Sequence, residues 1–220
     1  MVDRPKVLAA VNGKPFLSYL LNQLKKAGIR HAVLCTGYMG DMIRESVGND
    51  HNGMALAYSP EPIPLGTGGA LRLALPLLHS DPVLVMNGDS YCQTDLDAFF
   101  IWRREQDIPN AMVLTLLDDV ARFGSVEMDS RNRITRFREK TYEKSRGFVN
   151  AGIYLLCKKA IARIPEGRSV SLEREIFPAL IEEGIAGFLS RGEFIDIGTP
   201  ESYRTAEAFF DDLNVGRNHH

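Results

Sequence analysis

Residues 82–89 read Pro-Val-Leu-Val-Met-Asn-Gly-Asp, and this stretch decides the fold. The apolar run 83–86 lies between Pro82 and an Asn-Gly pair, which is typical of a short strand buried on both faces of a parallel sheet. The turn leaves Asp89 at the carboxyl end of that strand, the edge at which open α/β sheets bind ligands. A carboxylate there suits a hard cation such as Mg²⁺. Taken alone, the tripeptide 87–89 is more often only a polar turn.

The composition indicates a globular protein with a substantial core. At 220 residues the chain is long enough for one large domain, which we expect over 1–213, followed by a disordered tail over 214–220. The net charge of -2 and the lack of a basic stripe argue against nucleic acid as a partner. Charged residues interrupt every apolar run before it could span a bilayer, and no signal-peptide core is visible. We therefore expect a soluble cytoplasmic protein without a membrane partner.

The three cysteines, Cys35, Cys92 and Cys157, lie far apart and mostly inside apolar runs. An odd number of widely spaced cysteines is typical of reduced core thiols in the cytoplasm. The sequence therefore predicts neither a disulfide framework nor a zinc site.

Strand and helix patterns alternate along most of the chain. Helical spacing predicts helices at 15–27, 40–47, 70–78, 96–106 and 172–183 and after Pro200, and apolar runs predict strands at 31–36, 54–59, 83–86 and 112–117. This alternation predicts an α/β fold with a Rossmann-like mixed, mostly parallel sheet and helices on both faces. Alternating polar and apolar residues at 124–129 and 133–138 predict a small antiparallel extension. Ser171 and Thr199 are the expected caps of the last two helices.

A glycine-rich stretch, Leu-Gly-Thr-Gly-Gly-Ala at 65–70, follows a proline-rich approach and runs straight into a helix. Glycines let the backbone approach a ligand closely, and the amides at a helix start favour anionic or polar groups. A flexible loop with a helix cap would look the same, because the spacing matches neither the Walker loop nor the dinucleotide fingerprint.

Asp196 lies between Ile195 and Ile197 in an apolar strand pattern. A carboxylate in such a place is costly unless it is paired or holds a metal ion. Asp196 is therefore a stronger metal-ligand candidate than Asp89, whose position also fits a simple turn.

Seven short motifs together point to one family. In chain order they are Pro5-Lys6, Gly13-Lys14-Pro15, Leu65-Gly66-Thr67-Gly68-Gly69-Ala70, Asn87-Gly88-Asp89, Phe137-Arg138-Glu139-Lys140, Asn150-Ala151-Gly152 and Asp196-Ile197-Gly198-Thr199-Pro200. Each motif is weak by itself, but their order over almost the whole chain resembles the sugar-phosphate nucleotidyltransferase family. The branch of mannose-1-phosphate and heptose-1-phosphate guanylyltransferases is the most similar.

The resemblance implies an enzyme that transfers a nucleoside monophosphate from a nucleoside triphosphate to a sugar 1-phosphate with release of pyrophosphate. GTP is the expected donor and a heptose or mannose-type sugar the expected acceptor. The implied cofactor is Mg²⁺, since such transfers depend on alignment and on neutralising phosphate charge.

The resemblance also assigns roles to residues. It makes Lys6, Asp89, Lys140 and Asp196 catalytic, with Asp89 and Asp196 as ligands of Mg²⁺, Lys6 on the triphosphate and Lys140 on the sugar phosphate. The substrate-binding residues that it implies are Leu65, Gly66, Thr67, Gly68, Gly69, Asn87, Gly88, Glu139, Asn150 and Gly152. Among these, Thr67, Gly68 and Gly69 would line the base and ribose, and Glu139, Asn150 and Gly152 would meet sugar hydroxyls. Both lysines are equally compatible with ordinary solvated charges.

The chain departs from the family pattern at its start. Family members open with a buried strand and a glycine-rich loop that ends in an activating arginine, whereas this sequence starts just before Pro5-Lys6. We expect a shortened form of an active enzyme, a catalytically silent regulator that binds nucleotide sugars, or a sheet completed by 7–11 or by a partner such as a second copy. A metal-dependent phosphatase or glycosyltransferase is a further alternative, but neither explains Glu139-Lys140 or 150–152.

Overall fold

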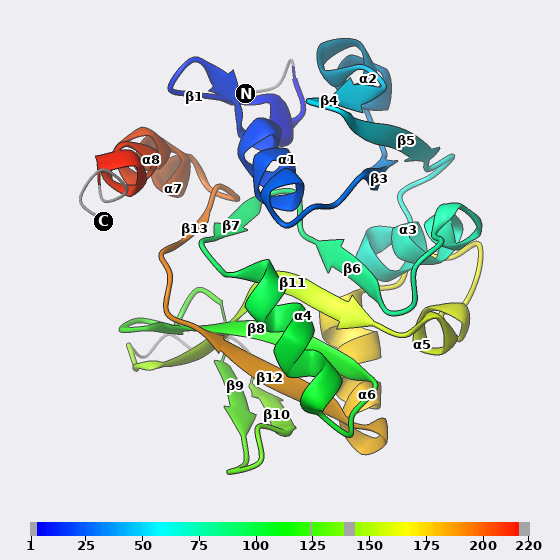
Figure 1. Ribbon diagram of the computed structural model, residues 1–220, viewed down its shortest axis with the longest axis vertical. Helices are drawn as coiled ribbons and strands as arrows, with labels where there is room; N and C mark the ends of the chain where they lie inside the picture. Colours follow the sequence, from blue (N-terminus) through cyan, green and yellow to red (C-terminus); the bar gives the residue numbers. More distant parts are fainter. Residues whose placement is uncertain (1–3, 124, 139–143, 216–220) are drawn as a thin grey trace.

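Figure 1 shows a computed structural model of the protein, which describes residues 4–123, 125–138 and 144–215. The α-helices are α1 (Phe16–Lys26), α2 (Gly40–Val47), α3 (Gly66–Ala74), α4 (Leu96–Glu105), α5 (Lys158–Ala162), α6 (Phe177–Glu183), α7 (Pro200–Arg204) and α8 (Ala206–Val215). The strands are β1 (Ala10–Val11), β2 (Lys14–Pro15), β3 (His31–Thr36), β4 (Asp50–His51), β5 (Met54–Pro60), β6 (Val83–Met86), β7 (Ser90–Cys92), β8 (Asn110–Leu117), β9 (Ser125–Met128), β10 (Ile134–Arg138), β11 (Gly147–Leu156), β12 (Ile185–Ser190) and β13 (Phe194–Asp196). Short 3-10 turns occur at Lys6–Leu8 and Leu75–Leu77, and a π-helical turn, η3, spans Leu172–Ile176.

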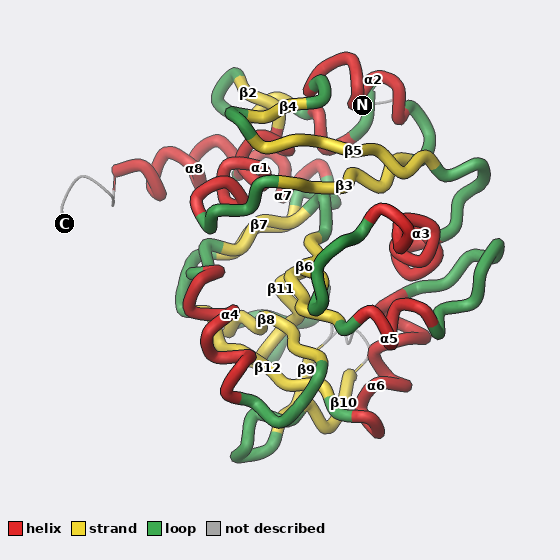
Figure 2. Tube along the Cα trace, turned by 45° about the vertical axis from the view of Figure 1, so that its right-hand side comes forward, coloured by secondary structure: helices red, strands yellow, loops and turns green. Residues whose placement is uncertain are grey.

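The largest sheet has the order β10-β9-β11-β8-β12, with β6 also paired to β11. Successive side chains of a strand point to opposite faces, so β8 shows which helices cover which face. Val113 packs with Phe99 of α4 on one face. Met112 and Leu114 pack with Phe177 of α6 on the other. The expected α/β fold with a mixed sheet and helices on both faces is therefore confirmed (Figures 1 and 2).

The pairing of β6 differs from the expectation. It forms an antiparallel ladder with β11, in which Ile153 opposes Met86 and Leu156 opposes Val83. Among the described strands, parallel ladders join β3 to β5 and β8 to β12, and the other ladders are antiparallel. The sheet is thus less parallel than the sequence indicates, because an apolar run does not reveal the direction of its neighbour. Val83 alone in β6 is fully buried.

Residues 7–11 do not complete the central sheet, so this form of the explanation is wrong, whereas completion by a partner stays a prediction. Lys6–Leu8 forms a 3-10 turn, and β1 pairs only with β2 in a two-stranded hairpin. Gly13 allows the tight turn between β1 and β2 because its φ is +72°. Among the described residues, β3 forms a ladder only with β5. Within the same described ranges, β6 pairs only with β11.

Two helix boundaries also correct the sequence analysis. The glycine-rich stretch is not a loop before the helix, since α3 begins at Gly66 rather than at residue 70. The predicted tail begins too early, because Asn214 and Val215 still belong to α8. Residues 216–220 lie outside the described part, so the rest of the tail prediction is untested.

The antiparallel extension is confirmed as the β9–β10 hairpin, which continues into the largest sheet where Val126 opposes Phe148. The three cysteines are free thiols, but the expected core position holds only for Cys92, since Cys157 is half-buried and Cys35 is exposed. Among the residues that the structure describes, no helix is both long and apolar enough to cross a membrane.

Candidate active site

Two strands distant in sequence bring the two candidate metal ligands together. In the antiparallel β7–β13 ladder, Asp196 opposes Ser90, the residue that follows Asp89. The ladder extends by one more bond, in which the amide of Ile197 donates to the carbonyl oxygen of Asp89 at 2.8 Å. Both carboxylates therefore lie at one edge, where β6 ends and β13 ends.

The electrostatics of this pair favour a bound cation. Burial raises the pKa of the Asp89 carboxyl, and the neighbouring charge of Asp196 raises it further, while Lys6 opposes the shift. Asp196 is half-buried at the end of β13, and its Oδ1 accepts a bond from the amide of Gly198 at 2.9 Å. Two carboxylates that repel one another in a partly buried place are a suitable oxygen donor set for a divalent cation.

No group of three or more histidine, cysteine or acidic side chains in the described part of the chain could hold a metal ion. Mg²⁺ does not require such a cage, because it commonly uses one or two carboxylates and takes its other ligands from water and substrate phosphates. The Asp89 and Asp196 pair therefore fits Mg²⁺ better than a metal that needs a complete protein shell.

Lys6 lies beside this edge, as the resemblance implies. Its Nζ donates to the carbonyl oxygen of Gly198 at 2.9 Å, which holds the ammonium group next to the segment that carries Asp196. The 3-10 turn around Lys6 packs close to Gly88, where an added Cβ would lie 3.2 Å from a Val7 methyl group. A larger residue at position 88 would therefore require Val7 to shift by a few tenths of an ångström.

Asn87, Asn150 and Gly152 form one network around the buried hydroxyl of Tyr154. Asn150 Nδ2 donates to Tyr154 Oη at 2.9 Å, and the Gly152 amide donates to Asn150 Oδ1 at 2.8 Å. The Asn87 amide donates to the Gly152 carbonyl at 2.8 Å. Burial raises the pKa of Tyr154, so the hydroxyl stays neutral, while hydrogen bonds with Asn150 and Asn87 partly oppose that shift. Tyr154 therefore holds Asn87 and Asn150 directly, and Gly152 joins the network through its bonds to these two asparagines.

Gly152 has a conformational reason to be glycine. Its φ is +76°, and an added Cβ would lie 2.6 Å from Ser90 Oγ. Only a residue without a side chain lets β11 pass so close to the turn that carries Asp89.

The glycines at the start of α3 approach the protein's own chain. The Val170 carbonyl accepts from the amides of Gly68 at 2.8 Å and Gly69 at 3.3 Å, and the Val170 amide donates to the Leu65 carbonyl at 2.8 Å. At Gly66, whose φ is +68°, an added Cβ would lie 2.7 Å from the Val170 carbonyl oxygen. The close approach that the sequence indicates is therefore at least partly an approach to residues 168–170.

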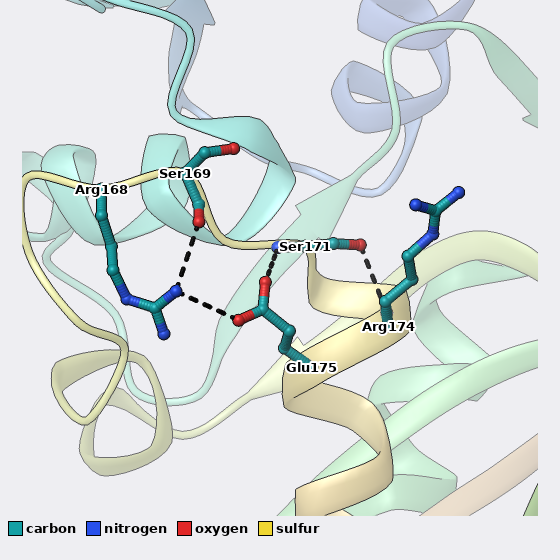
Figure 3. Close-up of polar contacts among 5 residues, drawn as sticks. All are labelled: Arg168, Ser169, Ser171, Arg174 and Glu175. Carbon is teal, nitrogen blue, oxygen red and sulfur yellow. Dashed lines mark hydrogen bonds and ion pairs between the residues drawn. The ribbon is translucent and has the colours of Figure 1, made fainter.

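The segment 168–171 is itself braced by Glu175, as Figure 3 shows. The Glu175 carboxylate accepts from the Ser171 amide at 2.9 Å and pairs with the Arg168 guanidinium at 3.3 Å. Ser171 Oγ accepts from the Arg174 amide at 3.2 Å, which confirms Ser171 as the expected cap.

Comparison with known proteins is consistent with this geometry. Residues 2–212 match the family model described as nucleotidyl transferase. The chain belongs to this family.

Two curated relatives illustrate the similarity of this nucleotidyl transferase to named proteins. A mannose-1-phosphate guanylyltransferase of Mycobacterium tuberculosis is 36% identical over 92% of the chain, but the chain spans only 57% of that relative. A D-glycero-alpha-D-manno-heptose 1-phosphate guanylyltransferase of Aneurinibacillus thermoaerophilus is 33% identical over 93% of the chain and 89% of the relative.

A solved structure shares the fold of this nucleotidyl transferase. The crystal structure of HddC from Yersinia pseudotuberculosis complexed with GMP-PN has a TM-score of 0.84 and 33% identity, and covers 94% of this chain and 91% of that one. The similarity therefore extends through the sheet and both of its helical layers.

Two residues connected to the candidate site of this nucleotidyl transferase, Tyr154 and Glu173, were not among the residues that the sequence predicted. Tyr154 lies in an apolar run and gave no polar signal, and Glu173 follows the predicted cap Ser171, a position usually explained by the helix dipole alone. The charge of Glu173 nevertheless contributes to the raised pKa of Asp89 and of Tyr154. Glu139 and Lys140 lie outside the described residues, and their predicted roles stay predictions.

Proposed function

We propose that this chain transfers GMP from GTP to the 1-phosphate of a heptose or mannose-type sugar and releases pyrophosphate. The observation that carries the proposal is the meeting of Asp89 and Asp196 across the β7–β13 ladder, beside Lys6. The names of the relatives, which are guanylyltransferases for mannose 1-phosphate and heptose 1-phosphate, support the choice of base and sugar.

In the proposed reaction an oxygen of the sugar 1-phosphate attacks the α-phosphorus of GTP, and the bond to the pyrophosphate oxygen breaks. Both reactants are anionic, so their alignment and the neutralisation of their charge supply most of the rate. Lys6 is proposed to contact the triphosphate as a point charge, and the bond of its Nζ to the Gly198 carbonyl, near Asp196, supports this role. Lys140 has the corresponding proposed role on the sugar phosphate.

Asp89 and Asp196 would hold Mg²⁺, which supplies Lewis-acid charge neutralisation to the phosphates when bound. The protein's own contribution is to fix the two carboxylates on a backbone ladder. Asn87 and Asn150, which bond to the buried Tyr154 hydroxyl, and Gly152, which bonds to Asn150, are proposed to orient the sugar hydroxyls.

The test is pyrophosphate release with Mg²⁺, in which GTP, ATP, UTP, CTP and dTTP are each combined with mannose 1-phosphate, heptose 1-phosphate and glucose 1-phosphate. We expect turnover with GTP and one of the first two sugars, and its loss in Asp196→Asn, whose melting temperature should be no lower than that of the wild type. Asp107→Asn is the matched control, because Asp107 is an exposed aspartate outside the site.

A catalytically silent regulator is the outcome that opposes this proposal. Binding of GDP-sugar by the wild-type chain without pyrophosphate release from any pair of substrates would favour that function. Turnover in Asp196→Asn equal to that of Asp107→Asn would remove Asp196 from the metal site.

A further inference from the structure

The hydroxyl group of Thr67 is held from two sides by the segment around η3. Thr67 Oγ1 donates to Glu173 Oε2 at 2.8 Å and accepts from the Leu172 amide at 2.9 Å. Ser171 Oγ donates to the same Glu173 oxygen at 2.9 Å. The Glu173 carboxylate therefore ties the first turn of α3 to the first turn of η3.

The hydrogen bonds to Glu173 are of a strong kind, because their acceptor is a carboxylate. A hydrogen bond to an ionised carboxylate is roughly twice as strong as one between neutral groups. Glu173 accepts two of them, from Thr67 and Ser171, and it is only partly exposed. Thr67 is exposed, so the link joins the start of α3 to η3 at the protein surface.

The backbone of η3 supports the same conclusion. It is a π-helical turn, in which the Ile176 amide donates to the Ser171 carbonyl five residues earlier at 3.3 Å. Such wide turns are rare in proteins, and those that do occur are often found at functional sites. Within this turn Glu173 bonds to Thr67, whereas Glu175 bonds to the Ser171 amide and to Arg168. Both glutamates also bond to Ser171, Glu173 at the hydroxyl group and Glu175 at the amide.

The backbone amides at the start of α3 differ in whether they have a hydrogen-bond acceptor. The Gly68 and Gly69 amides are used by the Val170 carbonyl, and the Leu65 amide is used by the Glu61 carboxylate. Among the described residues, the amides of Gly66 and Thr67 have no acceptor. Both precede the fourth residue of the helix, where amides have no partner inside the helix itself.

We propose that Glu173 is a positioning residue for the nucleotide, which fixes Thr67 so that the amides of Gly66 and Thr67 point at the anionic or polar groups of the bound GTP. The inference rests on the proposed function for the identity of the ligand.

The kinetic test compares Glu173→Ala and Glu173→Gln with the wild type. Glu173→Ala removes the acceptor, and we expect KM for GTP to rise about tenfold while kcat changes less than about threefold. Glu173→Gln keeps an acceptor oxygen without the charge, so it should restore part of the loss. Glu182→Ala is the matched control, because Glu182 is exposed on α6. An unchanged KM for GTP in Glu173→Ala would overturn the inference.

A double-mutant cycle tests whether Glu173 acts through Thr67. Thr67→Val removes the hydroxyl group, and Thr67→Ser retains it. We expect Thr67→Val combined with Glu173→Ala to raise KM no more than the worse single variant, and Thr67→Ser to behave like the wild type. Additive effects of the two substitutions would show that Glu173 does not act through Thr67.

A third measurement does not depend on catalysis. Hydrogen exchange of the backbone amides at 66–70 and 170–172 should become faster in Glu173→Ala and stay unchanged in Glu182→Ala. If the wild type shows no turnover with GTP, the proposed function fails, while the exchange result still decides whether Glu173 orders this segment. Equal exchange in both variants would overturn the positioning role.

Discussion

The amide of Ile197 donates a hydrogen bond to the carbonyl oxygen of Asp89 at 2.8 Å. This bond uses only backbone atoms, so it keeps the chain around both carboxylates in place whatever side chains these positions carry. Substitution of either aspartate by asparagine should therefore change charge and metal binding without unfolding the β7–β13 ladder.

Asp89→Asn should make the protein more stable at neutral pH while turnover is lost. Burial and the charge of Asp196 raise the pKa of Asp89 above its ordinary value, so ionisation of this carboxyl destabilises the folded state at pH 7. Below the ordinary pKa of 3.8 the Asp89 carboxyl is protonated in both the folded and the unfolded state. The difference in stability between Asp89→Asn and the wild type should therefore disappear there. Urea unfolding of wild type and variant at pH 7 and pH 3.5 checks this. An equal gain at both pH values would show that ionisation of Asp89 is not what destabilises the wild type.

Mg²⁺ should raise the melting temperature of the wild type in the presence of GTP. A ligand that binds only the folded state stabilises it by about 2.7 kcal/mol at a hundredfold excess over its Kd. The increment should be absent in Asp196→Asn, which loses one carboxylate, and retained in Asp107→Asn. An equal Mg²⁺ increment in the two variants would contradict a metal site at this edge.

Gly66→Ala should destabilise the protein more than Gly167→Ala. Both glycines have positive φ, so each substitution costs about 1–2 kcal/mol for the left-handed backbone. At Gly66 the new Cβ would also lie 2.7 Å from the Val170 carbonyl oxygen, whereas at Gly167 nothing lies within 4 Å. Urea unfolding measures the difference, which reports the contact between α3 and residues 168–170. Equal losses of unfolding free energy in the two variants would show that residues 168–170 shift at little cost to make room for the new Cβ.

Tyr154→Phe should cost about 1–3 kcal/mol of unfolding free energy and should also lower turnover. The substitution leaves Asn150 Nδ2 without its buried acceptor, and Tyr154 is 0% exposed. The control is Tyr38→Phe, because Tyr38 is 87% exposed. Turnover and urea unfolding of both variants test the network. A Tyr154→Phe protein as stable and as active as the control would show that Asn150 does not need its hydrogen bond to the Tyr154 hydroxyl.

Local patterns predicted most elements well. The bounds of β3, α2 and β6 agree with the expected ranges, because each has a clear apolar pattern with a turn signal at both ends. Ser171 and Thr199 act as the caps that the sequence indicates. The sequence analysis did not predict β7, which has only three residues. It also did not predict β12, the parallel neighbour of β8, because Gly187 interrupts the apolar pattern of that strand.

The sequence by itself determined the α/β class, the positions of most helices and strands, and the presence of Asp89 and Asp196 at strand ends. Only the tertiary structure decided that β6 runs antiparallel to β11, that β7 pairs with β13, and that Thr67 meets Glu173, 106 positions away in the chain. The physical reason is that helix and turn preferences depend on neighbouring residues, whereas strand pairing and side-chain bonds between distant segments depend on how the whole core packs.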